Sequence, residues 1–186
     1  YLPWRGYFDL FAKADVAVLL DSVQYTRRDW RNRNRIKTAR GPIWLTVPVE
    51  VKGRYDQAID ETRIADAGFA AAHVRTIDLA YRQAAGYADT APWLFAAMNA
   101  AGAEPLLAAV NERLLRAIAA RLGVPAEIRR CCEFVPRDQS PGMEASERLI
   151  EICRAAGATR YVSGPTAKDY LDVAALNRAG ITVQWM

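Results

Sequence analysis

The sequence predicts an α/β protein with a largely parallel, three-layer sheet and an inserted helical lobe. Two observations predict this class. Helical patterns separate most of the expected strands, as in parallel sheets that helices cover on both faces. One stretch, at about residues 68–122, is helical throughout and contains no expected strand. We therefore expect residues 1–186 to form a single α/β domain, with this stretch as a lobe over the carboxyl edge of the sheet.

The N-terminal part predicts a short helix and two strands. Apolar side chains recur at helical spacing over residues 7–14. The run of residues 14–20, which is apolar except for Asp15 and is closed by Asp21, is typical of a strand that is buried on both faces. Residues 43–51 are rich in β-branched and aromatic side chains, and Pro48 makes this an edge strand or a bulged one.

Helices and strands alternate in the C-terminal half. We expect helices at about 69–86, 91–101, 104–122, 140–157 and 167–180, and strands at 127–135, 160–164 and 181–185. Proline favours the first turn of a helix, so Pro92, Pro105 and the pair Ser140–Pro141 are expected to open three of these helices. No apolar run approaches the ~20 residues that a membrane-spanning helix needs.

Positive charge is concentrated in residues 27–40, which we call the basic segment. Seven of its residues are basic and one, Asp29, is acidic, so the segment carries +6 while the whole chain carries +4. Guanidinium groups bind phosphate in a bidentate way, and nearby Tyr and Trp rings offer flat stacking faces. If the backbone is extended, Asn32 and Asn34 share one face and the arginines the other. The segment predicts a site for a phosphate-bearing ligand; a merely solvated loop is the alternative.

Three side chains near the basic segment are further candidates. Asp21 follows a buried strand, at the edge where α/β sheets bind ligands, and is predicted to be a catalytic residue that orients a ligand hydroxyl or a basic partner. The alternative is a salt bridge to the arginines just after it. Gln24 and Tyr25 add an amide and a phenol for ligand binding.

Two candidates lie farther along the chain. His73 is the only histidine and is predicted to be a general acid or base. Its helical spacing with apolar residues leaves open that it is a satisfied core histidine. Ser163 and Gly164 stand between a strand and a helix, where free backbone N–H groups attract an anion, although most such turns are only helix caps.

The cysteines predict neither a disulfide framework nor a metal site. There are three, with no Cys-x-x-Cys and no second histidine to complete a zinc site. Cys131 and Cys132 are expected to lie in a strand on opposite faces, buried rather than reactive. A low, odd cysteine count is typical of a reducing compartment, so we expect a cytoplasmic protein.

Several stretches resemble the WbqC-like protein family. They are YLPWRGYFDLFAKADVAVLLDSVQYTRRDWRNRNRIKT with the following WLTVPV, SERLIEICRAAGATRY, and RYVSGPTAKDYLD with GITVQW. The spaced Phe69, His73, Ile77 and Tyr81 also resemble the family, which usually has Trp at the first position. Because NRNRIK matches the family stretch, the resemblance singles out Arg33, Asn34 and Lys37 as ligand-binding residues. Family members usually extend beyond both ends of this sequence, so we expect both termini to be trimmed.

A weaker resemblance connects LPWRGYFDLF to the first helix of nucleotidylyltransferase-like α/β folds. Trp4 and Tyr7 stand where that superfamily has the two histidines of its HxGH motif, and SGPTAKDYLD stands where it has a second phosphate motif. This resemblance implies a nucleotide pocket. It does not imply adenylyl transfer by paired imidazoles, because neither histidine is present.

The family resemblance implies a transferase in the biosynthesis of surface polysaccharide, such as O-antigen, or of small metabolites. Its substrate would bear phosphate, as a nucleotide-sugar or an acyl-coenzyme A or carrier thioester does, with a nucleotide or coenzyme A as cosubstrate. Two alternatives stay open. The basic segment with its aromatic residues suits a nucleic-acid-binding protein, and the missing histidines suit a nucleotide-binding relative without catalysis.

Overall fold

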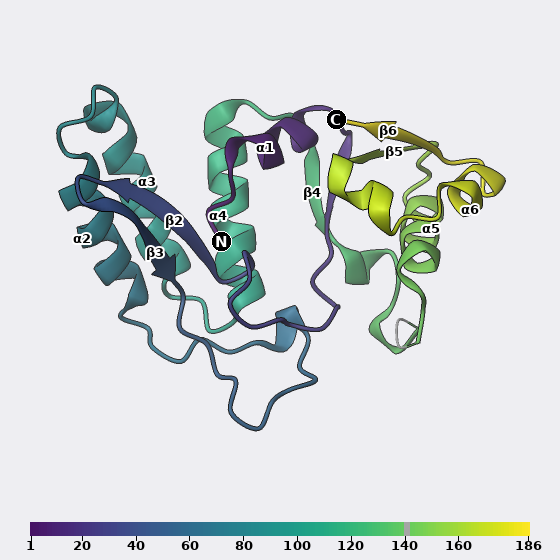
Figure 1. The fold of residues 1–186 in the computed structure, drawn as a ribbon, viewed down its shortest axis with the longest axis horizontal. Coiled ribbons are helices and arrows are strands. Elements are labelled where there is room, and N and C mark those ends of the chain that lie inside the picture. The colour runs from purple at the N-terminus through teal and green to yellow at the C-terminus, as the bar shows by residue number, and fades with distance from the viewer. Residues whose placement is uncertain (140–141) are drawn as a thin grey trace. The chain divides into compact units, whose positions relative to one another are not determined.

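The computed structural model describes residues 1–139 and 142–186, which form a mixed α/β structure (Figure 1). Contacts divide the chain into two compact units. Unit 1 contains residues 1–3 and 23–123, and unit 2 contains residues 4–22 and 124–186. Each unit has its own hydrophobic core. The single-domain prediction for residues 1–186 stays a prediction.

Unit 1 consists of a β-hairpin, a short 3₁₀ helix and three α-helices. Its elements are β2 (Arg33–Thr38), β3 (Gly41–Thr46), η1 (Ile59–Glu61), α2 (Phe69–Tyr81), α3 (Tyr87–Ala101) and α4 (Leu107–Leu122). Helix α2 packs against β2, and α3 packs against both α2 and α4 (Figure 1). The core includes Val47, Leu107 and Val110, which are fully buried. The three helices occupy the stretch for which the sequence predicts a helical lobe.

The hairpin differs from the sequence-based prediction. The sequence-based list of strands contains none within residues 33–38, but these residues form β2 in antiparallel register with β3, from Arg33 opposite Thr46 to Thr38 opposite Gly41. The apolar pattern missed this strand because Ile36 is its only apolar residue. Gly41 supports the tight turn with a φ of 107°, a conformation that other residues rarely adopt.

Unit 2 combines two parallel strand pairs with short helices. Its elements are α1 (Arg5–Ala12), β1 (Val16–Leu19), β4 (Glu127–Arg130), η2 (Cys131–Glu133), η3 (Arg137–Gln139), α5 (Ala145–Ala155), β5 (Arg160–Ser163), η4 (Pro165–Asp169), α6 (Val173–Arg178) and β6 (Thr182–Trp185). Strand β1 pairs with β4, and β5 pairs with β6. The buried residues Leu176 and Ile181 pack in one of its cores.

The described residues do not form the expected three-layer sheet. The six strands form three separate two-stranded sheets, of which the hairpin is antiparallel. The parallel pairing that the sequence predicts occurs in two places, between β1 and β4 and between β5 and β6. Each of these four strands has a single hydrogen-bonded neighbour, so the two pairs do not join into one sheet. A nucleotidylyltransferase-like fold is likewise not shown.

Several element ends also differ from the prediction. The helix expected at 91–101 begins earlier, at Tyr87, so Pro92 lies inside α3 rather than in its first turn. Cys131 and Cys132 lie in the 3₁₀ helix η2, not in a strand. The predicted helix start at Ser140–Pro141 lies outside the described residues, and α5 begins at Ala145. Within the described ranges, no helix has the length and apolar character to cross a membrane.

Candidate functional site

The solvent-exposed face of the hairpin in unit 1 gathers cations around a tryptophan. Arg33, Arg35 and Lys37 alternate along β2, and alternate residues of a strand point to the same face. The register sets Trp44 of β3 directly opposite Arg35. Arg33 and Arg35 place their guanidinium carbons 4.1 and 5.3 Å from the centroid of the Trp44 ring. We call these four residues the cationic face.

A second tryptophan extends the aromatic surface beside the cationic face. The ring centroids of Trp30 and Trp44 lie 5.4 Å apart, with the ring planes at 45°. Trp30 is 58% exposed and Trp44 is 43% exposed, although large aromatic side chains are usually well buried. Neighbouring Trp rings that remain accessible give a flat ligand group two surfaces on which to stack.

Carboxylates of the described residues do not neutralise the positive charges of the cationic face. In the part of the chain that the structure describes, no carboxylate pairs with Arg33, Arg35 or Lys37. The two guanidinium groups share one indole ring and so lie within about 10 Å of each other, one Debye length at 0.1 M salt. Like charges within this distance repel each other, and a bound anion relieves that repulsion.

The one carboxylate within the basic segment is already occupied. Asp29 accepts hydrogen bonds from the Thr26 hydroxyl (2.7 Å), from the Arg31 backbone (3.1 Å) and from the Arg31 guanidinium. Burial raises the pKa of Asp29, but these hydrogen bonds and the Arg31 charge outweigh burial, so the pKa lies below its ordinary value. Asp29 therefore pairs with Arg31 rather than with a residue of the cationic face.

The two asparagines of the basic segment, Asn32 and Asn34, donate hydrogen bonds from their side chains to backbone carbonyls of unit 1. As the alternation predicts, Asn34 lies on the face opposite to the arginines, where its amide donates to the Leu2 carbonyl at 2.6 Å. Asn32 is buried, and its side-chain amide donates to the Val47 carbonyl at 3.0 Å. The predicted ligand-binding role of Asn34 stays a prediction, and its amide nitrogen already has a partner in the fold.

Gln24 and Tyr25 precede the basic segment in unit 1. Gln24 is exposed, and its side-chain amide donates to the Tyr55 carbonyl at 3.1 Å. Tyr25 is buried. Burial and the Asp29 charge raise the pKa of the Tyr25 phenol, although the charges of nearby arginines, including Arg33, oppose the shift. Tyr25 is thus neutral at neutral pH and lies close to the charges of the segment.

His73 lies in the core of unit 1, on α2. Its Nδ1 is 2.9 Å from the Tyr1 hydroxyl, and its ring also hydrogen-bonds the backbone of Thr46. A neutral imidazole donates from one nitrogen and accepts at the other, so both of its positions are satisfied. Burial lowers the pKa of His73. This environment favours the satisfied core histidine, and the catalytic role stays a prediction.

Asp21 lies in unit 2, at the carboxyl ends of the parallel strands β1 and β4. The register sets Leu19 of β1 beside Arg130 of β4. The Oδ2 atom of Asp21 accepts from Nε and Nη2 of Arg130, at 2.8 and 2.7 Å. Its Oδ1 atom is 3.3 Å from the Cys131 thiol, which is also 3.2 Å from the Ser22 hydroxyl.

The sequence predicted only one member, Asp21, of this polar cluster of Asp21, Ser22, Arg130 and Cys131. The sequence offered the arginines just after Asp21 as its salt-bridge partners, whereas its ion-pair partner in the structure is Arg130, far along the chain. Arg130, Cys131 and Ser22 were not singled out. The signal that points to Arg130 is its place in the predicted 127–135 strand, which ends at the same edge as the strand before Asp21.

Ser163 and Gly164 also lie in unit 2, at the end of β5. Ser163 is buried, and its side chain hydrogen-bonds that of Tyr161. Gly164 precedes the five-residue 3₁₀ helix η4, and its carbonyl accepts from the Ala167 backbone at 3.2 Å. The local geometry matches the helix-cap alternative, and an anion-binding role stays a prediction. The predicted site residues are thus divided between the two units.

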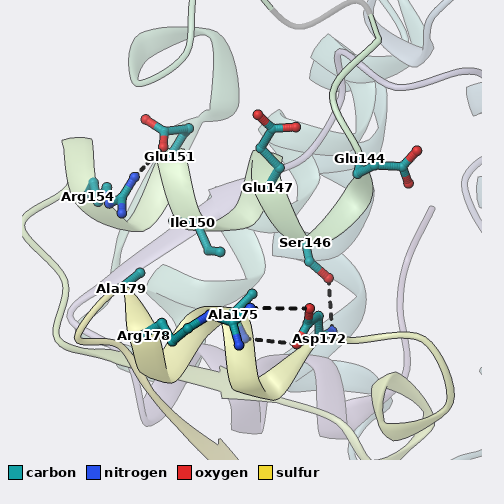
Figure 2. Close-up of a pocket in the computed structure, with 10 residues that line it drawn as sticks. All are labelled: Glu144, Ser146, Glu147, Ile150, Glu151, Arg154, Asp172, Ala175, Arg178 and Ala179. Atoms are coloured by element: carbon teal, nitrogen blue, oxygen red, sulfur yellow. Dashed lines mark hydrogen bonds and ion pairs between the residues drawn. The ribbon is translucent and has the colours of Figure 1, made fainter.

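A groove of about 460 Å³ lies between α5 and α6 in unit 2, and the sequence did not predict it (Figure 2). Asp172 accepts from the Ala175 backbone at 2.8 Å and caps α6, while Glu151 pairs with Arg154 at 2.7 Å. None of the predicted site residues lines this groove. Among the described residues, no group of His, Cys, Asp and Glu is arranged to hold a metal ion.

Comparison with known proteins gives the family. The WbqC-like protein family matches residues 1–186. A Mycobacterium tuberculosis (strain ATCC 25618 / H37Rv) protein named "Uncharacterized protein Rv1507c" is 44% identical over 185 residues, which cover 100% of this chain and 78% of that protein. No solved structure matches the chain. The chain belongs to the WbqC-like protein family, which confirms the resemblance seen in the sequence.

Proposed function

We propose that this WbqC-like protein is a transferase that binds a phosphate-bearing substrate on the cationic face of its hairpin. The substrate would be a nucleotide-sugar or an acyl-coenzyme A or carrier thioester, used in the biosynthesis of surface polysaccharide, such as O-antigen, or of small metabolites. The observation that carries the proposal is that Arg33 and Arg35 stack on the exposed Trp44 and that, among the described residues, no carboxylate pairs with either of them. The family resemblance supports the biosynthetic setting, and the low cysteine count supports a cytoplasmic location.

The two kinds of side chain on this face recognise the two parts of a nucleotide. Hydrogen bonds from charged donors to phosphate contribute about 1.5–3 kcal/mol each. Stacking of a base on an aromatic side chain contributes about 1–3 kcal/mol. A ligand that carries both a phosphate and a flat ring therefore gains from the arginines and from Trp44 together, whereas a simple sugar carries neither of these groups.

The catalytic candidates need a different test from the binding candidates. The hydrogen bonds that His73 and Asp21 make inside their own units favour positioning roles for both side chains. If His73 nevertheless transfers a proton, replacing it by Ala should reduce turnover and leave ligand binding nearly unchanged. Unchanged turnover would remove His73 from the mechanism.

Ligand-induced thermal stabilisation tests the proposal. Nucleotide-sugars and coenzyme A thioesters at about 100 times Kd should stabilise the fold by roughly 2.7 kcal/mol. For a chain of this size, that corresponds to a rise in Tm of about 5–11 °C. The Arg35→Gln variant should weaken binding by about 10–100-fold, the loss expected for one charged hydrogen bond.

A matched control separates local contacts from net charge. Arg75→Gln removes one positive charge from an exposed position of α2 outside the cationic face, and should leave affinity nearly unchanged. Equal losses in the two variants, or no stabilisation by any phosphate-bearing ligand, would contradict the proposal.

Nucleic-acid binding is the second candidate function, favoured by the row of cations beside two accessible tryptophans. Salt dependence distinguishes the two. For a single strand, log K falls with log salt by about 0.7 per phosphate contacted, so an oligonucleotide spanning the face gives a slope of several units. Binding confined to oligonucleotides, with such a slope, would favour this candidate. Ligand binding without turnover would favour a non-catalytic nucleotide-binding protein.

A further inference from the structure

We infer that the ligand of the cationic face carries phosphate at two positions separated by a ribose, as in the 3′-phospho-ADP portion of coenzyme A. A nucleotide-sugar, with its single diphosphate, fits this face less well. The inference rests on the proposed function, because it concerns the same face, and it narrows the class of substrate.

The first argument is the spacing of the cations. A β-strand rises about 3.4 Å per residue, so Arg33, Arg35 and Lys37 are set about 7 Å apart along β2, and the row spans about 14 Å. One diphosphate is compact and meets only part of this row. Anionic groups on both sides of a ribose can meet both ends of it.

The second argument is the chemistry of the individual cations. Arg35 is a forked donor that can bind phosphate in a bidentate way, and Arg33, whose Nη2 donates to the Arg28 carbonyl, adds a second positive charge; both guanidinium groups lie against Trp44. Lys37 carries a compact point charge, which suits a terminal monophosphate. The arrangement therefore assigns the diphosphate to the two arginines and the 3′-phosphate to Lys37.

The third argument is the position of the stacking surface. Trp44 lies opposite Arg35, the middle cation of the row, and directly opposed Cβ atoms are about 4.5–5.5 Å apart. A purine stacked on the accessible part of Trp44 or Trp30 would set its ribose near the middle of the row. Its phosphates would then extend toward the two ends.

The fourth argument concerns what the face lacks. A sugar presents hydroxyl donors, which carboxylates bind well, but among the described residues no carboxylate belongs to this face and Asp29 is occupied by Arg31. The residues that oppose the three cations are Thr46, Trp44 and Pro42. The cations and Trp44 can bind phosphate and an aromatic ring. The face offers few groups that would bind the hydroxyls of a sugar specifically.

Two ligands that differ by one phosphate test the inference. Isothermal titration calorimetry with coenzyme A and 3′-dephospho-coenzyme A should give a Kd about 10–100-fold lower for coenzyme A. Lys37→Gln should bring the two Kd values close together by weakening coenzyme A alone. Trp44→Leu should weaken both ligands to a similar extent, and Arg75→Gln should change neither. Circular dichroism of each variant confirms that it is folded.

The possible results separate this inference from the proposed function. If both ligands bind equally well, or if a nucleotide-sugar binds more tightly than coenzyme A, the inference is wrong and the proposed function stands. A preference for coenzyme A that survives Lys37→Gln also overturns it. If neither coenzyme A ligand nor any nucleotide-sugar binds, both the inference and the proposed function fail.

Discussion

Replacing Asp21 by Asn should destabilise the protein by about 2 kcal/mol, more than the loss of an ordinary surface ion pair. The substitution keeps the size of the side chain and removes the charge that accepts two hydrogen bonds from Arg130, at 2.8 and 2.7 Å. It therefore tests whether the cluster at the carboxyl ends of β1 and β4 stabilises unit 2.

The magnitude follows from the exposure of the two partners. Removing one partner of a fully buried ion pair costs about 3–5 kcal/mol, and an exposed pair contributes about 0.2–1 kcal/mol. The side chain of Asp21 is 9% exposed, whereas that of Arg130 is 33% exposed and keeps access to water. We place the loss between these limits, at about 2 kcal/mol, which lowers Tm by about 4–8 °C in a chain of this size.

Thermal and urea unfolding followed by circular dichroism provide the assay. Glu112→Gln is the matched control, because Glu112 pairs with Arg116 at 2.8 Å while the two side chains are 23% and 49% exposed. The control should lose no more than about 1 kcal/mol. If Asp21→Asn is no more destabilising than Glu112→Gln, the cluster does not stabilise unit 2 and the reasoning from burial is refuted.

Three further predictions concern the cores and one helix end. Because burial lowers the pKa of His73 below its ordinary 6.5, the unfolded chain binds a proton more readily than the folded chain, and the free energy of unfolding should fall as pH drops through 6.5. Urea titrations at several pH values should show a smaller fall for His73→Gln; an identical fall would exclude His73 as its source. Leu176→Ala should cost about 2–5 kcal/mol in urea unfolding, since Leu176 is 0% exposed, and a loss below 1 kcal/mol would contradict its core position. Gly123→Ala should lower stability by about 1–2 kcal/mol in the same assay, because Gly123 ends α4 with a φ of 67°; an unchanged midpoint would argue against that conformation.

Local patterns predicted the helices better than they predicted the sheets. The apolar spacing of residues 104–122 and the glycine after them indicated α4, because a helix buries one stripe and ends where the left-handed conformation is easy. The hairpin was missed because charged residues occupy the exposed face of β2 and asparagines occupy part of its inner face. Its register depends on pairing with β3, which no apolar pattern within β2 records.

The candidate site was predictable where it depends on neighbours in sequence. The sequence alone shows the high density of arginines in the basic segment. The alternation of Arg with Asn predicted that Arg33 and Arg35 share one face of an extended strand, as they do in β2. The counterion of Asp21 was not predictable from nearby residues, because Arg130 reaches it only through the parallel pairing of β1 with β4. The helical spacing of His73 predicted that it faces apolar residues. Its hydrogen bond with Tyr1 was not predictable from neighbouring residues, because the two lie 72 positions apart in the chain.

The hairpin also shows how a small sheet avoids pairing with strands of other molecules. A two-stranded sheet leaves an open edge on each strand, and open edges can template aggregation. On β2 the Lys37 amide donates to the Tyr81 hydroxyl at 3.0 Å, so that donor is not offered to an incoming strand. On β3 Pro42 has no amide hydrogen to offer. The charges that we propose to bind phosphate would also keep copies of the hairpin apart, so replacing them together should make the protein more prone to aggregate.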